Sequence, residues 1–228
     1  MASSPSPPKG WEFWIDRGGT FTDLIGVSPD GRQASAKLLS ASPAYDDAAV
    51  EAMRRMMATA PGAPFPGADV AAIKLGTTVA TNALLERKGA KTLLVTTAGF
   101  ADALLIGDQA RPDLFALDIV RPAPLCAGVV EAEERLDASG EVVRPLGEAP
   151  LAAALARARA EGFESVAIAF IHADLDGRHE RRAGELAEAA GFDFVALSCE
   201  VSPLPRFVAR AETTMVEAYL APVLKGYA

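Results

Sequence analysis

The sequence predicts an α/β protein with a mixed sheet, in which an antiparallel meander of three strands comes first and parallel strands follow. Short apolar segments separated by glycine turns fill the first forty residues, which is typical of a meander. From residue 70 onward, continuous apolar runs alternate with stretches of helical periodicity, as in parallel strands that are buried on both faces. We therefore expect helices on both faces of the sheet.

The meander is expected at residues 13–15, 24–27 and 36–39. A glycine turn separates the first two strands, and Ser28-Pro29-Asp30-Gly31 forms the second turn, in which Gly31 is free to take a positive φ. The helix that follows, over residues 44–59, carries one apolar stripe at helical spacing. That stripe consists of Ala49, Val50, Met53 and Met57.

The later elements follow from the same patterns. Strands are expected at residues 73–75, 92–96, 165–171 and 194–197, and helices at 79–88, 151–161, 178–190 and 206–227. Gly89, Gly162 and Gly191 stand where left-handed cap residues end the first three helices. Residues 129–144 are predicted to form a hairpin around a glycine turn, and Pro222 is expected to bend or break the last helix.

Composition excludes several classes of protein. The 228 residues are 50% apolar and 23% charged, which suits one large domain or a domain with an appendage. A net charge of −8 without a basic patch argues against nucleic-acid binding. No apolar run reaches the roughly 18 residues that cross a bilayer, so no membrane contact is expected. Residues 1–10 are expected to be a disordered tail, and Cys126 and Cys199 to be buried thiols of a cytoplasmic protein.

The string DRGGTFTD, between two apolar runs, predicts a phosphate-binding turn. Gly18 and Gly19 let backbone N–H groups and an anion approach each other closely, and Thr20 and Thr22 add hydroxyl donors. Asp16 ends the first strand, where its carboxylate can hold Mg²⁺ directly or through water. The alternative is a plain hairpin turn in which the two glycines serve geometry alone.

A second candidate site is the block GTTVATNALLERKG. Its Gly76-Thr77-Thr78 segment follows a short strand and opens a helix, whose free N–H groups suit a carboxylate or a developing oxyanion. Alternatively, Thr77 or Thr78 simply caps the helix. Thr81 and Asn82 add neutral donors, whereas Arg87 and Lys88 are interpreted as solvated charges.

Other polar residues are harder to assign. Arg111 suits a clamp for a substrate carboxylate, and a surface salt bridge is an equal alternative. His172 and His179, with Asp174 and Asp176 between them, match no zinc spacing and are interpreted as structural, with Asp176 as a helix N-cap. Neither cysteine has a neighbouring histidine in sequence, so neither is interpreted as a nucleophile.

Five strings in the same order resemble the N-terminal region of the hydantoinase A and 5-oxoprolinase family, which belongs to the actin-like ATPase superfamily. They are IDRGGTFTD, KLLS, KLGTTVATNALLERKGAKTLLVTTAGF, IGDQARPDLFAL and RAETTMVEAYLAPVL, and they cover most of residues 12–224. KLLS and IGDQARPDLF are closer to the 5-oxoprolinase branch than to the N-methylhydantoinase or ketone carboxylase branches.

The resemblance implies a ribonuclease-H-like half-domain over residues 11–205, followed by a helix over 206–228 that leads into a further ATPase domain. It implies ATP and Mg²⁺ as cofactors and conversion of 5-oxo-L-proline, ATP and water into glutamate, ADP and phosphate. It also implies partners in the remaining hydantoinase A and B-type domains or subunits, and a homo-oligomeric complete enzyme. The chain alone is expected to turn nothing over.

The implied roles fall into three groups. They are catalysis by Asp16 (also the metal ligand), Thr77 and Thr78; cofactor binding by Gly18, Gly19, Thr20, Thr22 and Asp23; and substrate binding by Gly76, Asn82 and Arg111. The alternatives are an N-methylhydantoinase or ketone carboxylase subunit, a carbohydrate or acetate kinase fragment, and a non-catalytic interaction domain that has kept the fold.

Overall fold

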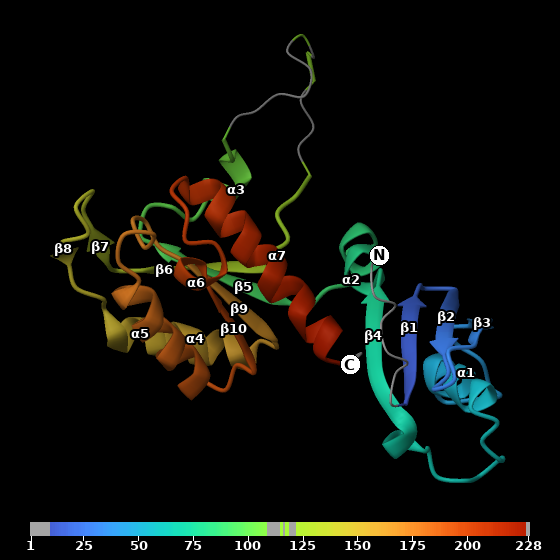
Figure 1. Ribbon diagram of the computed structural model, residues 1–228. Helices are drawn as coiled ribbons and strands as arrows, with labels where there is room; N and C mark the ends of the chain where they lie inside the picture. Colours follow the sequence, from blue (N-terminus) through green and yellow to red (C-terminus); the bar gives the residue numbers. More distant parts are fainter. Residues whose placement is uncertain (1–9, 109–114, 116, 119–121, 227–228) are drawn as a thin grey trace, which may run out of the picture. The chain divides into compact units, whose positions relative to one another are not determined.

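Two compact units make up the chain, each with its own sheet (Figure 1). The computed structural model describes residues 10–108, 115, 117–118 and 122–226. We call Met1–Asn82 the N-terminal unit and Ala83–Ala228 the C-terminal unit. The predicted mixed α/β architecture is confirmed, and its antiparallel-then-parallel sheet lies in the N-terminal unit. The strands from residue 92 onward form a separate sheet, which the sequence analysis did not separate from the first.

The N-terminal unit contains a four-stranded sheet in the order β3-β2-β1-β4. β1 and β2 are antiparallel, as are β2 and β3, whereas β4 runs parallel to β1 at one edge of the sheet. The elements are β1 (Trp11–Arg17), β2 (Phe21–Val27), β3 (Gln33–Leu39), α1 (Ala48–Met56), the short 3-10 helix η1 (Gly67–Asp69) and β4 (Val70–Thr77).

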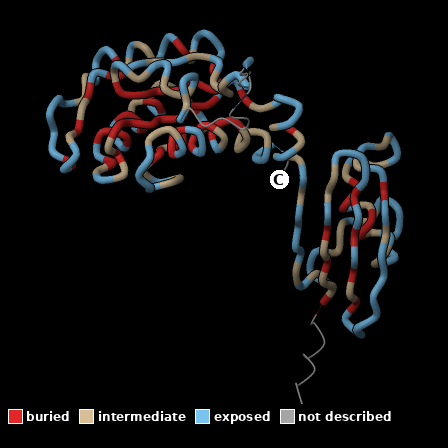
Figure 2. The backbone as a smooth tube through the Cα atoms, turned by 90° about the horizontal axis from the view of Figure 1, so that it is seen from above, coloured by how far each residue is buried: buried red, intermediate tan, exposed pale blue. Residues whose placement is uncertain are grey.

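Alternation along the strands gives this sheet two different faces. In β2 the side chains of Thr22 and Leu24 are buried, and those of Phe21, Asp23 and Ile25 are exposed. Buried and exposed residues alternate along the strands of this unit (Figure 2). The helix α1 packs on the buried face. Among the described helices of this unit, α1 packs on this buried face and not on the opposite one. We call the opposite face of the sheet the open face. The core between sheet and helix consists of Phe13, Ile15, Leu24, Leu38, Ala48, Ala49, Ala52 and Met53.

The position of α1 is set by Asp47. One carboxylate oxygen accepts a hydrogen bond from the Val50 amide at 2.9 Å, and the other accepts one from Arg17 at 2.5 Å. Burial raises the pKa of Asp47, but the Val50 amide and the Arg17 charge outweigh it, so the pKa lies below its ordinary value. The apolar stripe predicted for this helix is only partly correct. Ala49 and Met53 are buried, but Val50 is 38% exposed and Met57 follows the end of the helix.

The C-terminal unit has a parallel sheet in the order β10-β9-β5-β6 with helices on both faces. The helices α4 and α5 pack on one face, and α7 packs on the other (Figure 1). The elements are α2 (Val79–Leu85), in which the unit boundary falls, β5 (Thr92–Thr97), α3 (Ala103–Ile106), β6 (Gly128–Ala132), β7 (Arg135–Leu136), β8 (Val142–Arg144), α4 (Glu148–Ala160), β9 (Ser165–Ala169), α5 (Arg178–Ala189), β10 (Phe194–Leu197), α6 (Ser198–Val201) and α7 (Phe207–Lys225).

Three expectations about these elements are corrected. Gly89 does not have a positive φ; Arg87 does, at 53°, and α2 ends at Leu85. A side chain at Gly89 would overlap the ring of Tyr219, so close packing explains this glycine. Pro222 does not break α7, which continues to Lys225. Of the predicted hairpin, β6 joins the parallel sheet instead, and only β7 and β8 pair with each other.

A buried ionic network holds α7 against the carboxyl end of β9. Arg210, 2% exposed, donates to the Ser198 hydroxyl at 2.6 Å and to the Phe170 carbonyl at 2.9 Å, and its guanidinium lies 3.7 Å from Glu180 and 3.4 Å from Asp174. Burial raises the pKa of Glu180, although the hydroxyl of Ser198 and two backbone amides donate to its carboxylate.

His179 and the two cysteines have the following surroundings in the C-terminal unit. His179 Nδ1 lies 2.8 Å from a buried oxygen of Glu134, and no metal-binding group of three His, Cys, Asp or Glu residues occurs among the described residues. The predicted N-cap of α5 is corrected: Gly177 is the cap residue, and Asp176, one residue earlier, accepts from the Arg178 amide at 2.8 Å. Both cysteines are free and partly buried, and burial raises the pKa of Cys199 to about 12. In the part of the chain that the structure describes, no helix is long and apolar enough to cross a bilayer.

Candidate functional site

The turn between β1 and β2 presents hydrogen-bond donors that the chain itself does not use. The Gly18 amide donates to the Phe21 carbonyl at 2.9 Å and closes the turn. Among the described residues, the amides of Gly19 and Thr20 and the Thr20 hydroxyl have no hydrogen-bond partner in the chain. Backbone donors gathered in a turn suit an anion.

Neither loop glycine has a positive φ, so the turn does not require glycine for its backbone conformation. A Cβ at Gly18 would lie 3.1 Å from the Phe21 carbonyl oxygen, and one at Gly19 would lie 3.2 Å from the side-chain nitrogen of Asn82. The two glycines therefore allow close packing of the turn and close approach of another molecule, as the sequence predicts.

Ser40, at the end of β3, fixes the other side of the turn. Its amide donates to the Thr20 carbonyl at 2.8 Å, and its hydroxyl donates to the Gly18 carbonyl at 2.7 Å. The hydroxyl of Thr22 lies 3.0 Å from that of Ser40. Because Thr22 is fully buried, the structure shows its hydroxyl supporting the turn, and contact with a cofactor stays a prediction.

Two carboxylates lie directly opposite each other beside the turn. Asp16 on β1 is in register with Asp23 on β2, and both are exposed on the open face. Lys37 on β3 neutralises Asp23, with contacts of 2.8 and 3.0 Å. Among the described residues the Asp16 carboxylate has no ion pair or hydrogen bond. Lys37 therefore offsets the charge of Asp23, and no described side chain offsets the charge of Asp16.

β4 brings the second candidate block to the same end of the sheet, and its threonine hydroxyls are used locally. Thr77 donates to the Arg17 carbonyl at 3.0 Å and accepts from the Val79 amide at 3.1 Å. Its hydroxyl therefore joins β4 to β1 and caps α2, which is the structural alternative, and a catalytic role for Thr77 stays a prediction. Thr78 is exposed, and the Asn82 side chain lies 3.5 Å from its hydroxyl.

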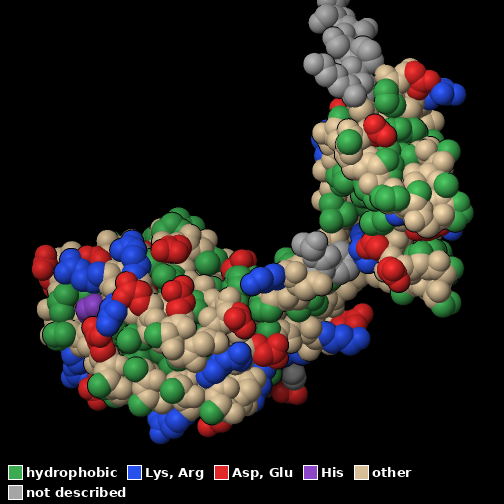
Figure 3. Space-filling view, turned by 90° about the horizontal axis from the view of Figure 1, so that it is seen from below, with side chains coloured by type: hydrophobic (Ala, Val, Ile, Leu, Met, Phe, Trp, Pro, Cys, Tyr) green, Lys and Arg blue, Asp and Glu red, His purple; other side chains and the backbone are tan. Residues whose placement is uncertain are grey.

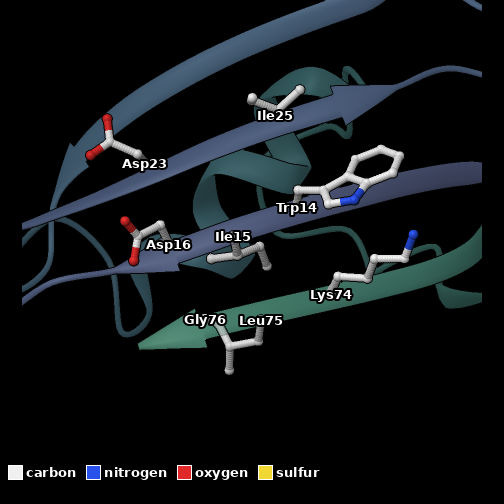
Figure 4. A pocket seen from close by; sticks show the side chains of 8 residues that line it. All are labelled: Trp14, Ile15, Asp16, Asp23, Ile25, Lys74, Leu75 and Gly76. Carbon is white, nitrogen blue, oxygen red and sulfur yellow. The ribbon is translucent and has the colours of Figure 1, made fainter. Parts of the chain in front are cut away.

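A hollow of about 340 Å³ extends from this acidic pair along the open face (Figure 4). Gly76 on β4 lies in register with Asp16 and contributes no side chain to it. Asp16 and Asp23 lie at one end of the hollow, and Trp14 and Lys74 lie at the other. Its lining consists of Trp14, Ile15, Asp16, Asp23, Ile25, Lys74, Leu75 and Gly76.

The N-terminal unit exposes large apolar side chains on both faces of its sheet and on α1. Figure 3 shows hydrophobic side chains gathered over the N-terminal unit. Phe21, Ile25 and Leu39 belong to the open face, whereas Ile73 and Leu75 are in register with the core residues Phe13 and Ile15. Val50 is exposed on α1. Exposed apolar surface of this kind is typical of a surface that contacts a ligand or another protein segment.

The structure thus brings the predicted residues together, with one exception. Arg111 lies outside the described residues. Sequence reasoning missed the roles of Lys37, Ser40, Trp14 and Lys74. The KLLS string contains two of them, and Lys74 directly precedes the LGTT segment, but only the register between strands shows what they face.

The fold and the site together define a class of protein. It is an α/β protein in which a glycine-rich turn, an unpaired carboxylate and a hollow lie together on one sheet. The sequence model described as "Hydantoinase/oxoprolinase N-terminal region" matches residues 12–191. The chain therefore belongs to the hydantoinase/oxoprolinase family and contains its N-terminal region.

Known relatives extend the comparison. The chain is 40% identical to a 5-oxoprolinase of Saccharomyces cerevisiae, over 93% of its own length. It is 39% identical to 5-oxoprolinase 1 of Arabidopsis thaliana, over 94% of its own length. Each match covers 19% of the relative. It thus spans about a fifth of these relatives.

Two solved structures share the fold. The crystal structure of the ATP-dependent caprolactamase from Pseudomonas jessenii matches with a TM-score of 0.78 and 34% identity, over 95% of this chain and 32% of that one. A nucleotide-free structure of acetone carboxylase, described under the mechanism of ATP-dependent acetone carboxylation, matches with a TM-score of 0.75 and 26% identity. The match covers 92% of this chain and 32% of that one.

Proposed function

We propose that this chain is the N-terminal piece of an ATP-dependent cyclic amide hydrolase of the 5-oxoprolinase kind. The complete enzyme would convert 5-oxo-L-proline, ATP and water into glutamate, ADP and phosphate. The observation that carries the proposal is the set of unused donors in the Gly18–Thr20 turn beside the unpaired carboxylate of Asp16. Relatives named 5-oxoprolinase, and a structural neighbour described as ATP-dependent, support the substrate class and the nucleotide.

The turn binds the terminal phosphates of ATP in this proposal. The amides of Gly19 and Thr20 and the Thr20 hydroxyl donate to phosphate oxygens, while Ser40 keeps the turn in shape by holding the carbonyls of Gly18 and Thr20. Positioning of this kind is most of what a protein contributes to phosphoryl transfer. The nearby Lys37 prevents Asp23 from adding a second uncompensated negative charge.

The donor set beside the turn fits magnesium. This ion is usually bound by one or two carboxylates together with phosphate oxygens and water, and Asp16 with Asp23 opposite offers that set. Mg²⁺ held by Asp16 would neutralise part of the phosphate charge. The chain's own task is to keep Asp16 unpaired and exposed at the end of β1, which its register opposite Gly76 achieves.

Phosphorylation solves the chemical difficulty of a lactam. The carbonyl of a five-membered cyclic amide is a poor electrophile, so the amide oxygen first attacks the terminal phosphorus of ATP and ADP leaves. Water then adds to the ring carbon, the ring C–N bond breaks with a proton passing to nitrogen, and a second water releases phosphate. Glutamate, ADP and phosphate result.

Gly76 provides a test that separates the hollow from the fold. A Cβ at this position meets nothing closer than the Ile15 carbonyl at 3.8 Å, so Gly76→Ala should leave the unfolding free energy unchanged within about 0.5 kcal/mol. The added methyl would project beside Asp16 and weaken ligand binding by about 1–3 kcal/mol, or about fivefold to 150-fold. KM values of the complete enzyme and thermal unfolding would measure both effects.

Gly26→Ala is the matched control. Its Cβ would lie 2.7 Å from the Met56 sulfur and 2.9 Å from the Phe13 ring, on the buried face away from the hollow. It should lower stability by about 1–3 kcal/mol without a specific effect on KM. Full activity in the Gly76→Ala enzyme would show that no ligand occupies the space beside Asp16.

A second candidate function is favoured by the structural neighbours. Caprolactamase acts on a lactam without a carboxylate, and acetone carboxylase on a ketone. Phosphate release by the complete enzyme should therefore be measured with 5-oxoproline, caprolactam, hydantoin, acetone with bicarbonate, and sugars. Preference for 5-oxoproline supports the first proposal, preference for caprolactam or acetone supports the second, and preference for a sugar overturns both.

The 228-residue chain alone should bind ATP weakly and release no phosphate.

A further inference from the structure

The hollow on the open face has two ends of different chemistry. One row of residues across the sheet joins Asp23, Asp16 and Gly76 through their registers, and the next row on the same face joins Ile25, Trp14 and Lys74. The rows are two residues apart along each strand, or roughly 7 Å at about 3.3–3.4 Å per residue. One end is therefore acidic and adjoins the turn, and the other is apolar and cationic (Figure 4).

Lys74 differs from the other lysine on this face in lacking a carboxylate partner. Its ammonium lies 4.8 Å from the centre of the Trp14 ring, and no ion pair joins it to any acidic residue in the described part of the chain. Lys37, by contrast, is bound to Asp23 at 2.8 Å. An ammonium above an aromatic face keeps N–H donors free for an anion, so Lys74 has the charge and the donors to bind a carboxylate.

We propose that Lys74 and Trp14 form the subsite that selects lactams with a carboxylate, Lys74 binding the carboxylate and Trp14 the ring. The inference rests on the proposed function, because the substrate's amide oxygen must lie at the acidic end, where the phosphoryl group arrives. In 5-oxoproline the carbonyl carbon and the carboxylate-bearing carbon flank the ring nitrogen. The two polar groups therefore project in different directions, and one molecule can direct its carbonyl toward Asp16 and its carboxylate toward Lys74.

The flat walls of this end suit a small ring. Trp14, which is partly buried, and Ile25, which is 50% exposed, lie in register on adjacent strands and provide an apolar surface for ring carbons. Lactams without a carboxylate would contact the same surface and leave the Lys74 ammonium without an anionic partner. Lys74 is thus a specificity residue in this proposal, and it takes no part in bond breaking.

The test compares two lactams in the complete enzyme, with and without the Lys74 charge. Lys74→Gln should raise the KM for 5-oxoproline about tenfold to a hundredfold, the usual effect of losing a hydrogen bond to a charged group. The KM for 2-pyrrolidinone as a substrate, or its inhibition constant as a competitive inhibitor, should change less than about twofold, because this lactam has no carboxylate to bind. The kcat for 5-oxoproline should stay the same.

Two further variants complete the experiment. Lys74→Arg keeps the positive charge and should retain most of the affinity for 5-oxoproline, and Lys88→Gln, an exposed lysine paired with Glu86, should change neither constant. An equal rise for both lactams, or no rise for 5-oxoproline, would overturn the subsite. A wild-type enzyme that hydrolyses ATP with neither lactam would overturn the proposed function itself, and the inference with it.

Discussion

Asp16→Ala abolishes magnesium- and ATP-dependent turnover of the complete enzyme and leaves the fold intact; this is the largest effect on activity that we expect. We expect a loss of at least about a hundredfold, as when one electrostatic group of an active site is removed. The side chain is exposed and has no partner among the described residues, so no packing is lost. Removing one of two opposed carboxylates should instead stabilise the N-terminal unit by about 0.2–1 kcal/mol.

Phosphate release at increasing magnesium concentration, together with thermal unfolding, measures both parts of this prediction. Asp16→Asn keeps the shape and removes the charge, so it should lose activity as Asp16→Ala does. Asp46→Asn, at another exposed aspartate of the same unit, should behave as wild type. Unchanged turnover in Asp16→Ala would exclude this residue from the mechanism, and a large fall in melting temperature would attribute the loss to unfolding.

The largest effect on stability is expected from Arg210→Met. The guanidinium is buried and binds the Ser198 hydroxyl and the Phe170 carbonyl, with Glu180 and Asp174 close by. Removing one partner of a buried ionic network leaves the others without compensation, which typically costs about 3–5 kcal/mol. We therefore expect α7 to lose its attachment to the sheet of the C-terminal unit.

The two tryptophans make this effect assignable to one unit. Trp11 and Trp14 both belong to the N-terminal unit, so tryptophan fluorescence follows its unfolding. Far-UV circular dichroism during urea unfolding follows the helices α4, α5 and α7. Arg210→Met should shift the dichroism transition and leave the fluorescence transition in place. The side chain of Arg181 is 60% exposed. Arg181→Met should therefore change the unfolding free energy obtained from either signal by no more than about 0.5 kcal/mol. Coincident shifts in both signals would contradict a role confined to the C-terminal unit.

Local patterns predicted the strands of the N-terminal unit and the turn between β1 and β2. Their signals lie within a few residues of one another: alternation along β2, two glycines and a flanking aspartate. Gly31, Gly162 and Gly191 have the positive φ angles that their positions predict. These features depend on the conformation of one short segment, so the sequence carries them directly.

The division into two sheets had no local signal. The run that forms β5 is apolar throughout, and this pattern is the same whether the strand extends the first sheet or begins a second one. β6 was predicted to be part of a hairpin strand because a glycine turn follows residues 129–136, but β6 pairs with β5. Strand order depends on contacts between distant segments, which periodicity does not record.

The residues of the candidate site were proposed from the sequence, but the contacts that support them were not. Asp16, Gly18 and Gly19 belong to one recognisable string. The pairing of Lys37 with Asp23, and the position of Lys74 beside Trp14, depend on the registers of β3 and β4 against their neighbours. A shift by one residue would send each side chain to the other face. Register was therefore the missing information.

The position of β4 has a practical consequence for anyone who prepares this chain. As the edge of its sheet, the strand leaves one row of backbone amides and carbonyls without a strand partner among the described residues, and Ile73 and Leu75 are about half exposed. Lys74 is the single charge along its eight residues. Sparsely charged edges of this kind template intermolecular pairing. Concentrated stocks should consequently precipitate, and a second lysine introduced at Ala71 should keep them clear.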